Sequence, residues 1–193
     1  MSKKEPQQFC PESLEQWRQW LQENHKIAAA VWLIQYKKGS SKPVIPWSDA
    51  VDEALCFGWI DSIRRPMDEE CFQQYFSPRK PQSIWSKINK DKVERLAAEG
   101  RMTEAGLECI RVAKENGSWS FFDDVENLVV PQDLEAALAK QDAANAFFQA
   151  QSKSTKKRML AWVVMAKRPE TREKRVMIIV KNATKQQVPK ELS

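Results

Sequence analysis

The sequence predicts an α+β fold, with a small antiparallel sheet in the N-terminal part followed by a mostly α-helical C-terminal part. Three observations lead to this class: an apolar, β-prone run at 27–38, two short β-prone runs around a turn-like connection at 59–77, and helical spacing of apolar residues after residue 83. The 193 residues include only 5 Gly and 10 Pro, and 42% are hydrophobic, which excludes a disordered or collagen-like chain.

The first 58 residues predict two helices around one strand. Pro11 suits the first position of a helix, and apolar residues follow it at spacings of three and four, which indicates a helix over 11–25. Residues 27–38 are apolar on both alternating faces, so we expect a central strand covered on both sides. Ser48 is the expected N-cap of a second helix, which ends near Gly58.

A hairpin and several helices are expected in the rest of the chain. The runs 59–65 and 71–77 flank a Pro-Met-Asp-Glu-Glu connection, which favours an antiparallel hairpin. Ser83 and Thr103 are the expected N-caps of two helices that point Ile88 and Leu107 inward. Further helices are expected at 131–140, from 142 onward, at 154–167 and at 169–183.

The length of the chain fits a single compact domain over 1–193, with a mixed α/β segment at 1–82 and a helical segment at 83–193. Its longest apolar runs, 28–34 and 159–166, are far too short to span a bilayer, and the first residues lack the apolar stretch of a secretory signal. We therefore expect no membrane span and a cytoplasmic location.

Several classes of site are excluded or disfavoured by what the sequence lacks. His25 is the only histidine, the four cysteines form no CxxC pair, and no glycine-rich phosphate-binding motif is present. We therefore expect no metal and no cofactor, and the cysteines are expected to be reduced. The residues alone assign no catalytic role and leave open whether the chain is an enzyme.

Charge is distributed unevenly along the chain. Residues 153–193 hold twelve Lys and Arg against three Glu, whereas residues 1–152 hold 19 basic and 23 acidic groups. Such asymmetry favours a surface that meets anions, such as a nucleic acid, a phosphorylated metabolite or an acidic protein. The alternative is a basic surface that only faces solvent.

A first candidate binding site combines aromatic and polar residues of the predicted hairpin with the start of the next helix. If Arg64 and Arg79 lie on neighbouring strands, their guanidinium groups can converge on a carboxylate or phosphate. The alternative is that Asp61 pairs with one of these arginines and that the tryptophans belong to the core. The candidate residues are Trp59, Asp61, Arg64, Arg79, Ser83 and Trp85.

A second candidate site lies near the C-terminus. Lys156 and Lys157 fall at the start of a predicted helix, where the helix dipole disfavours cations. Arg168, Arg172 and Arg175 recur at spacings of four and three, which places them on one stripe of the next helix. We expect Lys156, Lys157, Arg168 and Arg172 to bind a polyanion or a phosphorylated ligand together, unless the stripe is only a solvated face.

Four ordered motifs carry a resemblance to a known family. They are EALCFGWIDS at 53–62, FSPRKPQSIWSKIN at 76–89, GRMTEAGLECIRVAKENGSW at 100–119 and AKRPETREKR at 166–175. Together they resemble the bacterial YdeI/OmpD-associated, or bacteriocin-protection, family. The resemblance implies a small cytoplasmic protein with a helical C-terminal domain, but it assigns no catalytic residue and no cofactor to the chain, so it indicates the family and not the activity.

Three functions from different classes remain open. The first is a binding or protection protein whose Trp- and Arg-lined pocket holds a small anionic or aromatic ligand. The second is weak association with nucleic acid or an acidic protein through the basic C-terminal helices. The third is an enzyme that uses Asp61 as a base and arginines as electrophiles, which requires a carboxyl group of raised pKa inside a pocket.

Overall fold

The computed structural model describes residues 6–192, and the chain divides into two compact units, Met1–Ser120 (unit 1) and Phe121–Ser193 (unit 2). Each unit has its own cluster of buried hydrophobic residues. The division falls at 120/121, later than the 82/83 boundary that we predicted between a mixed and a helical segment. That the units together form one compact domain stays a prediction.

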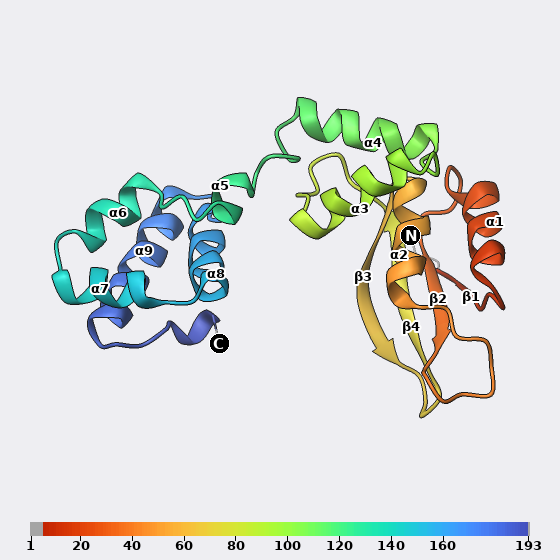
Figure 1. Cartoon of the computed structure of the whole chain (residues 1–193), viewed down its shortest axis with the longest axis horizontal. Helices are drawn as coiled ribbons and strands as arrows, with labels where there is room; N and C mark the ends of the chain where they lie inside the picture. Colours follow the sequence, from red (N-terminus) through yellow and green to blue (C-terminus); the bar gives the residue numbers. More distant parts are fainter. Residues whose placement is uncertain (1–5, 193) are drawn as a thin grey trace, which may run out of the picture. The chain divides into compact units, whose positions relative to one another are not determined.

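Unit 1 contains a four-stranded sheet and four helices, shown in red to green in Figure 1. The elements are β1 (Gln7–Phe9), α1 (Leu14–Asn24), β2 (Val31–Tyr36), α2 (Trp47–Cys56), β3 (Trp59–Pro66), β4 (Cys71–Pro78), α3 (Lys87–Ala98) and α4 (Glu104–Glu115). The α+β class is therefore confirmed, and so is the hairpin, which β3 and β4 form.

The sheet has the strand order β1-β2-β4-β3. β4 pairs antiparallel with both β2 and β3, as expected, and a bulge interrupts β3 between Asp61 and Arg64. β1 is the strand that the sequence did not predict. It pairs parallel to β2, because the helix α1 between the two strands returns the chain to the same end of the sheet.

The expectation that the 27–38 strand is covered on both sides is wrong. The strand is confined to β2, where buried and half-exposed residues alternate. Val31 and Leu33 are fully buried against α1 and α2, together with Phe76 of β4. Trp32 and the other outward residues of β2 remain half-exposed, so the helices of unit 1 cover one face of the strand.

Several helix starts differ from the expected positions, because other side chains provide the caps. Ser13 caps α1 instead of Pro11 beginning it, and Ser86 caps α3 in place of Ser83. The Thr103 cap of α4 is confirmed.

Two of the helix residues expected inward point outward instead. Ile88 on α3 is 68% exposed and Leu107 on α4 is 43% exposed. Val93 and Leu96 fill the buried face of α3 in place of Ile88. The second helix of unit 1, α2, begins at Trp47 after Pro46 and has no side-chain cap, so Ser48 lies inside it.

Unit 2 is helical, shown in green to dark blue in Figure 1. Its elements are α5 (Asp123–Glu126), α6 (Gln132–Leu138), α7 (Asp142–Ala150), α8 (Lys153–Val164), α9 (Pro169–Thr184) and the 3-10 turn η1 (Lys190–Leu192). Leu134, Phe148, Leu160 and Ile179 form the centre of its core. Within residues 6–192, no helix has the length and apolar character needed to cross a bilayer.

Candidate anion-binding site

Arg79 is the most unusual of the predicted site residues. It follows β4, and its backbone N–H donates to the carbonyl of Gly58 at 2.9 Å, which fixes its position beside the start of β3. Only 8% of the residue is exposed. Its guanidinium carbon lies 3.9 Å from the centre of the Trp85 ring, and Nη2 donates to the carbonyl oxygens of Ser83 at 3.3 Å and Ile84 at 3.0 Å.

The buried charge of Arg79 has no carboxylate partner. Among the residues the structure describes, no Asp or Glu lies within ion-pair distance of it. A guanidinium has five N–H donors, and the two carbonyls engage only Nη2, so Nε and Nη1 remain open to a further acceptor. Burial lowers the pKa of Arg79 to about 10, which still leaves the group charged at neutral pH.

A small cavity lies against Arg79. Its volume is about 90 Å³, and it is lined by Arg79, Lys80, Pro81, Trp85, Glu108, Cys109 and Val112. Glu108 is the one acidic residue of this lining. Its two oxygens accept from Nη2 and Nε of Arg111 at 2.6 and 2.7 Å, which neutralises its charge. The cavity therefore combines an unpaired cation with mostly apolar walls.

Two glycines allow α4 to bring Cys109 to this cavity. A Cβ added to Gly58, whose φ is +73°, would lie 2.8 Å from the Cys109 sulfur, and one added to Gly106 would lie 2.4 Å from the carbonyl oxygen of Cys56. Both approaches are closer than a side chain tolerates. Burial raises the pKa of the Cys109 thiol, and the nearby Arg79 opposes that shift.

Asp61 forms a separate polar contact on the helix-covered face of the sheet. Its Oδ2 accepts from Nε1 of Trp47 at 3.1 Å and from Nε2 of Gln74 at 3.3 Å. Burial raises the pKa of Asp61, and the hydrogen bond from Trp47 opposes that shift. Asp61 forms no ion pair with Arg64 or Arg79 in the described chain, so the structural pair considered as an alternative is absent.

The two arginines of the predicted hairpin site do not converge. Arg64 pairs in register with Gln74, and its guanidinium lies 3.6 Å from the centre of the Phe72 ring. Arg79 lies five residues further along the chain from Gln74, which is about 16 Å of extended strand. The structure thus separates Arg64 from the Arg79 cavity.

The remaining residues of the first candidate site divide between core and cavity. Trp59 is 1% exposed, packs edge-on against Trp20 and donates from Nε1 to the carbonyl of His25, so it belongs to the core. Trp85 is also buried, but its ring supports Arg79. Ser83 contributes a carbonyl to Arg79.

The second candidate site is largely paired within unit 2. Lys157 lies 2.5 Å from Glu126, and Arg172 donates to both carboxylate oxygens of Asp133 at 2.6 and 2.9 Å. Lys156 donates to the amide oxygen of Gln149 at 3.4 Å, and its Nζ lies 5.9 Å from the centre of the Phe148 ring. Glu126 therefore compensates part of the positive charge at the start of α8.

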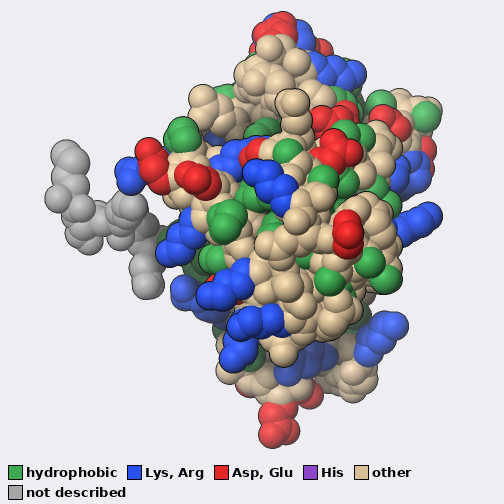
Figure 2. Space-filling view, turned by 90° about the vertical axis from the view of Figure 1, so that its left-hand side faces the viewer, with side chains coloured by type: hydrophobic (Ala, Val, Ile, Leu, Met, Phe, Trp, Pro, Cys, Tyr) green, Lys and Arg blue, Asp and Glu red, His purple; other side chains and the backbone are tan. Residues whose placement is uncertain are grey.

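Arg168 is exposed at the N-cap of α9, and no hydrogen bond or ion pair involves its side chain among the described residues. Arg175 donates to the carbonyl of Trp162 at 2.5 Å. On the face drawn in Figure 2, Lys and Arg side chains occur together with Asp and Glu. Joint binding of a polyanion by Lys156, Lys157, Arg168 and Arg172 stays a prediction.

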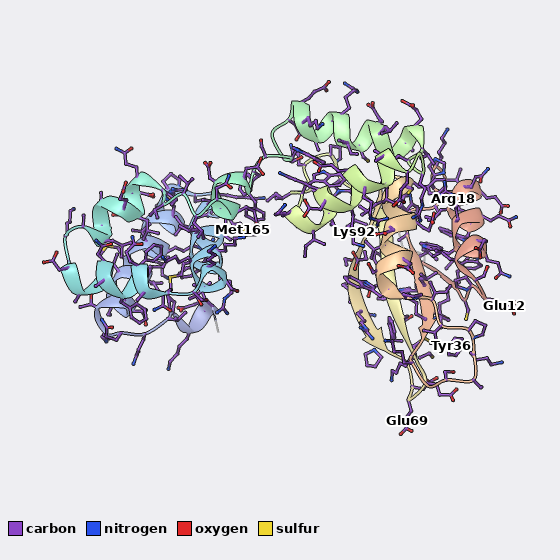
Figure 3. All side chains as sticks on the ribbon, viewed as in Figure 1. Glu12, Arg18, Tyr36, Glu69, Lys92 and Met165 are labelled. Atoms are coloured by element: carbon purple, nitrogen blue, oxygen red, sulfur yellow. The ribbon has the colours of Figure 1, made fainter. Side chains whose placement is uncertain are left out.

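Two buried carboxylates on α2 were missed by the sequence reasoning. Glu53 pairs with Arg18 of α1 at 2.5 Å and with Arg101 at 2.6 Å. Asp52 pairs with Lys92 and Arg95 of α3. Figure 3 labels Arg18 and Lys92, which reach α2 from α1 and α3. Each oxygen of the two carboxylates accepts from one cation, so these pairs join α2 to α1, to α3 and to the segment before α4.

Five residues of the cavity lining were not selected by the sequence reasoning: Lys80, Pro81, Glu108, Cys109 and Val112. Lys80 follows Arg79 directly in the FSPRKP run, so its position in the sequence could have selected it as a site residue. Cys109 lies 30 residues after Arg79, and the close approaches that Gly58 and Gly106 permit bring it to the cavity. In the described part of the chain, no group of three His, Cys, Asp or Glu residues is placed to hold a metal ion.

Two family models match parts of the chain. Residues 9–109 match the model of a domain of unknown function (DUF8412), and residues 127–186 match the model described as bacteriocin-protection, YdeI or OmpD-associated. The first match covers just over half of the chain and includes Arg79, Trp85 and Cys109. Neither the curated proteins nor the solved structures compared with the chain gave a match.

Proposed function

We propose that this chain, which belongs to the family of the DUF8412 domain and carries a bacteriocin-protection, YdeI or OmpD-associated domain at 127–186, has a binding function. Unit 1 binds a small anionic ligand in the cavity beside Arg79. The observation that carries this proposal is a buried arginine, 8% exposed as a residue, whose guanidinium has no carboxylate partner among the described residues. The resemblance seen in the sequence is thereby confirmed for the C-terminal region.

The chemistry of the cavity favours a ligand with one negative group and a small apolar body. Burial disfavours the charge of Arg79, so an anion that accepts from Nε and Nη1 would offset part of that cost. Trp85 holds the guanidinium plane from one side, which fixes the direction of those donors. Pro81 and Val112 offer apolar contacts to the rest of the ligand.

The alternative functions have weaker support. Asp61 has the raised pKa that a general base needs, but it is absent from the lining of the Arg79 cavity. The C-terminal cations Lys157 and Arg172 already have carboxylate partners. Anion binding at Arg79 is therefore the function that we pursue.

The proposal is tested by alkylating Cys109 with a charged and a neutral reagent. Iodoacetate and iodoacetamide both form a carbon–sulfur bond and release iodide, but only iodoacetate carries a carboxylate. If Arg79 attracts anions, the rate ratio of iodoacetate to iodoacetamide should be about tenfold higher at Cys109 than at the exposed Cys10 of the same chain. Peptide mass spectrometry measures both sites in one sample.

Two variants make the experiment specific. Arg79→Gln should lower the ratio at Cys109 to the value at Cys10, whereas Arg64→Gln, an exposed arginine away from the cavity, should leave it unchanged. Far-UV circular dichroism checks that each variant is folded. Equal ratios at the two cysteines of the wild-type protein would contradict the proposal.

A further inference from the structure

A groove of about 400 Å³ lies between α6 and α9, two neighbouring helices of unit 2 (Figure 1). Two of its lining residues are on α6 and five are on α9. They recur at spacings of three and four, which places them on one face of each helix. The volume of the groove is in the range of sites that bind one small organic molecule.

Most of the groove lining is apolar. It consists of Ala137 on α6 and of Pro169, Val176 and Met177 on α9. Val176 belongs to the buried core of unit 2, whereas Met177 is 59% exposed. A methionine side chain is flexible and polarisable, so it adapts to apolar ligands of different shapes. An apolar ligand in the groove would remove Met177 from water, which favours binding.

The charged residues of the lining leave one carboxylate without a partner. Asp133 accepts from Nε and Nη2 of Arg172 at 2.6 and 2.9 Å, so these two charges compensate each other. Glu173 forms no hydrogen bond or ion pair among the described residues. It lies beyond the first turn of α9, where the helix dipole would favour an anion. The cations nearby in the sequence, Arg168 and Lys174, do not line the groove.

We propose that the groove between α6 and α9 binds a small organic cation, a primary amine with an apolar body. The ammonium group pairs with Glu173, and the apolar body lies against Met177. Charge decides against an acid, because a carboxylate in the groove would be repelled by Glu173 and would find Arg172 already paired with Asp133. The site lies in unit 2 and is independent of the Arg79 cavity, which belongs to unit 1.

Methionine-methyl NMR of the full chain tests the proposal, because Met177 is the one methionine that lines the groove. The chain has 6 Met, and the variant Met177→Leu assigns the signal of this residue. The probe 2-phenylethylamine should shift the Met177 signal in a saturable way, with a millimolar Kd because so small a ligand makes few contacts. The acid 3-phenylpropanoate, which has a similar size, should bind at least about threefold more weakly.

Two variants show whether Glu173 is the partner of the amine. Glu173→Gln should raise the Kd of 2-phenylethylamine about two- to fivefold, the range expected when one exposed ion pair is lost. Glu135→Gln, which changes an exposed carboxylate of α6 outside the lining, is the matched control and should leave this Kd unchanged. The neutral probe 2-phenylethanol should bind the wild-type protein about as weakly as the amine binds Glu173→Gln.

Three results would overturn the proposal. The first is the absence of a saturable shift of the Met177 signal with 2-phenylethylamine. The second is equal binding of 2-phenylethylamine and 3-phenylpropanoate, which would mean that the groove selects only for the apolar body. The third is the same amine Kd for Glu173→Gln and for the wild type.

Discussion

At the scale of single residues, Arg79 and Asp61 show how burial acts on opposite charges. Burial lowers the pKa of Arg79 and raises the pKa of Asp61, because in both cases it disfavours the charged form. Asp61 receives two hydrogen bonds that favour its carboxylate, yet desolvation is the larger effect. The two residues attract each other but form no ion pair.

The raised pKa of Asp61 predicts a specific dependence of stability on pH. A carboxyl group that binds its proton more tightly in the folded protein stabilises the fold below its unfolded pKa, and this contribution is lost as pH rises through the folded pKa. Asp61→Asn keeps the shape without titrating. The free energy of unfolding of Asp61→Asn, minus that of the wild type, should therefore increase as pH rises from about 3 to 7.

Urea unfolding of both proteins at several pH values measures this difference. Asp91→Asn, at an exposed aspartate of α3 that pairs with Lys87 at 2.9 Å, makes the same chemical change on the surface for comparison. A constant difference between Asp61→Asn and wild type across the range would show that burial does not govern Asp61.

The sequence predicted individual residues of the site better than their grouping. Arg79 and Trp85 were selected together from one short stretch, and they do stack. Arg64 was grouped with them on the assumption that neighbouring strands align the two arginines. The register places Arg64 opposite Gln74 instead, and register depends on long-range packing that no local pattern contains.

At the scale of elements, α6 and α9 are joined by the Arg172–Asp133 pair. Arg172→Glu should destabilise unit 2 by up to about 1 kcal/mol, because it removes a partly exposed ion pair and sets two acids against each other. Arg168→Glu should change stability by less than about 0.5 kcal/mol, because this side chain has no partner among the described residues.

Thermal unfolding of the two single variants decides this prediction. Equal losses for Arg172→Glu and Arg168→Glu would mean that the ion pair with Asp133 adds nothing to the contact between α6 and α9. A larger loss for Arg168→Glu would point to a contact of Arg168 that the described residues do not provide.

The elements themselves were largely predictable from local patterns. The helices of the C-terminal half lie where the spacing of apolar residues predicted them. The β3–β4 hairpin lies where the turn-like connection between two β-prone runs predicted it. The expectation that both faces of β2 are covered was wrong for a physical reason. Apolar residues occur on both faces of this strand, and such a sequence predicts burial of both faces. The polar Gln35 lies on the buried face beside Val31 and Leu33, where its side chain donates to the carbonyl of Ile45.

At the scale of the whole molecule, the two buried clusters are separate. All members of the second cluster lie after residue 121, from Val125 to Ala183 among its fully buried residues. The segment 121–193 expressed alone should therefore fold, with a helical circular dichroism spectrum and a cooperative thermal transition. Its stability should be modest, since a chain of this size buries only about 60% of its surface.

A destabilised core variant provides the control for this fragment. Leu160→Ala should abolish or strongly lower the transition, because Leu160 is fully buried and such a change costs about 2 to 5 kcal/mol. A gradual, non-cooperative melt of the unchanged fragment would mean that unit 2 needs residues 1–120 to fold.

The stacking of Arg79 on Trp85 gives this protein an intrinsic optical signal. Indole emission responds to nearby charge and to the exclusion of water, and Trp85 is the one tryptophan that lines the Arg79 cavity. Of the eight tryptophans in the chain, it is therefore the one whose fluorescence reports directly on occupancy of that cavity. Binding of small acids to unlabelled protein can thus be screened through its intrinsic tryptophan fluorescence.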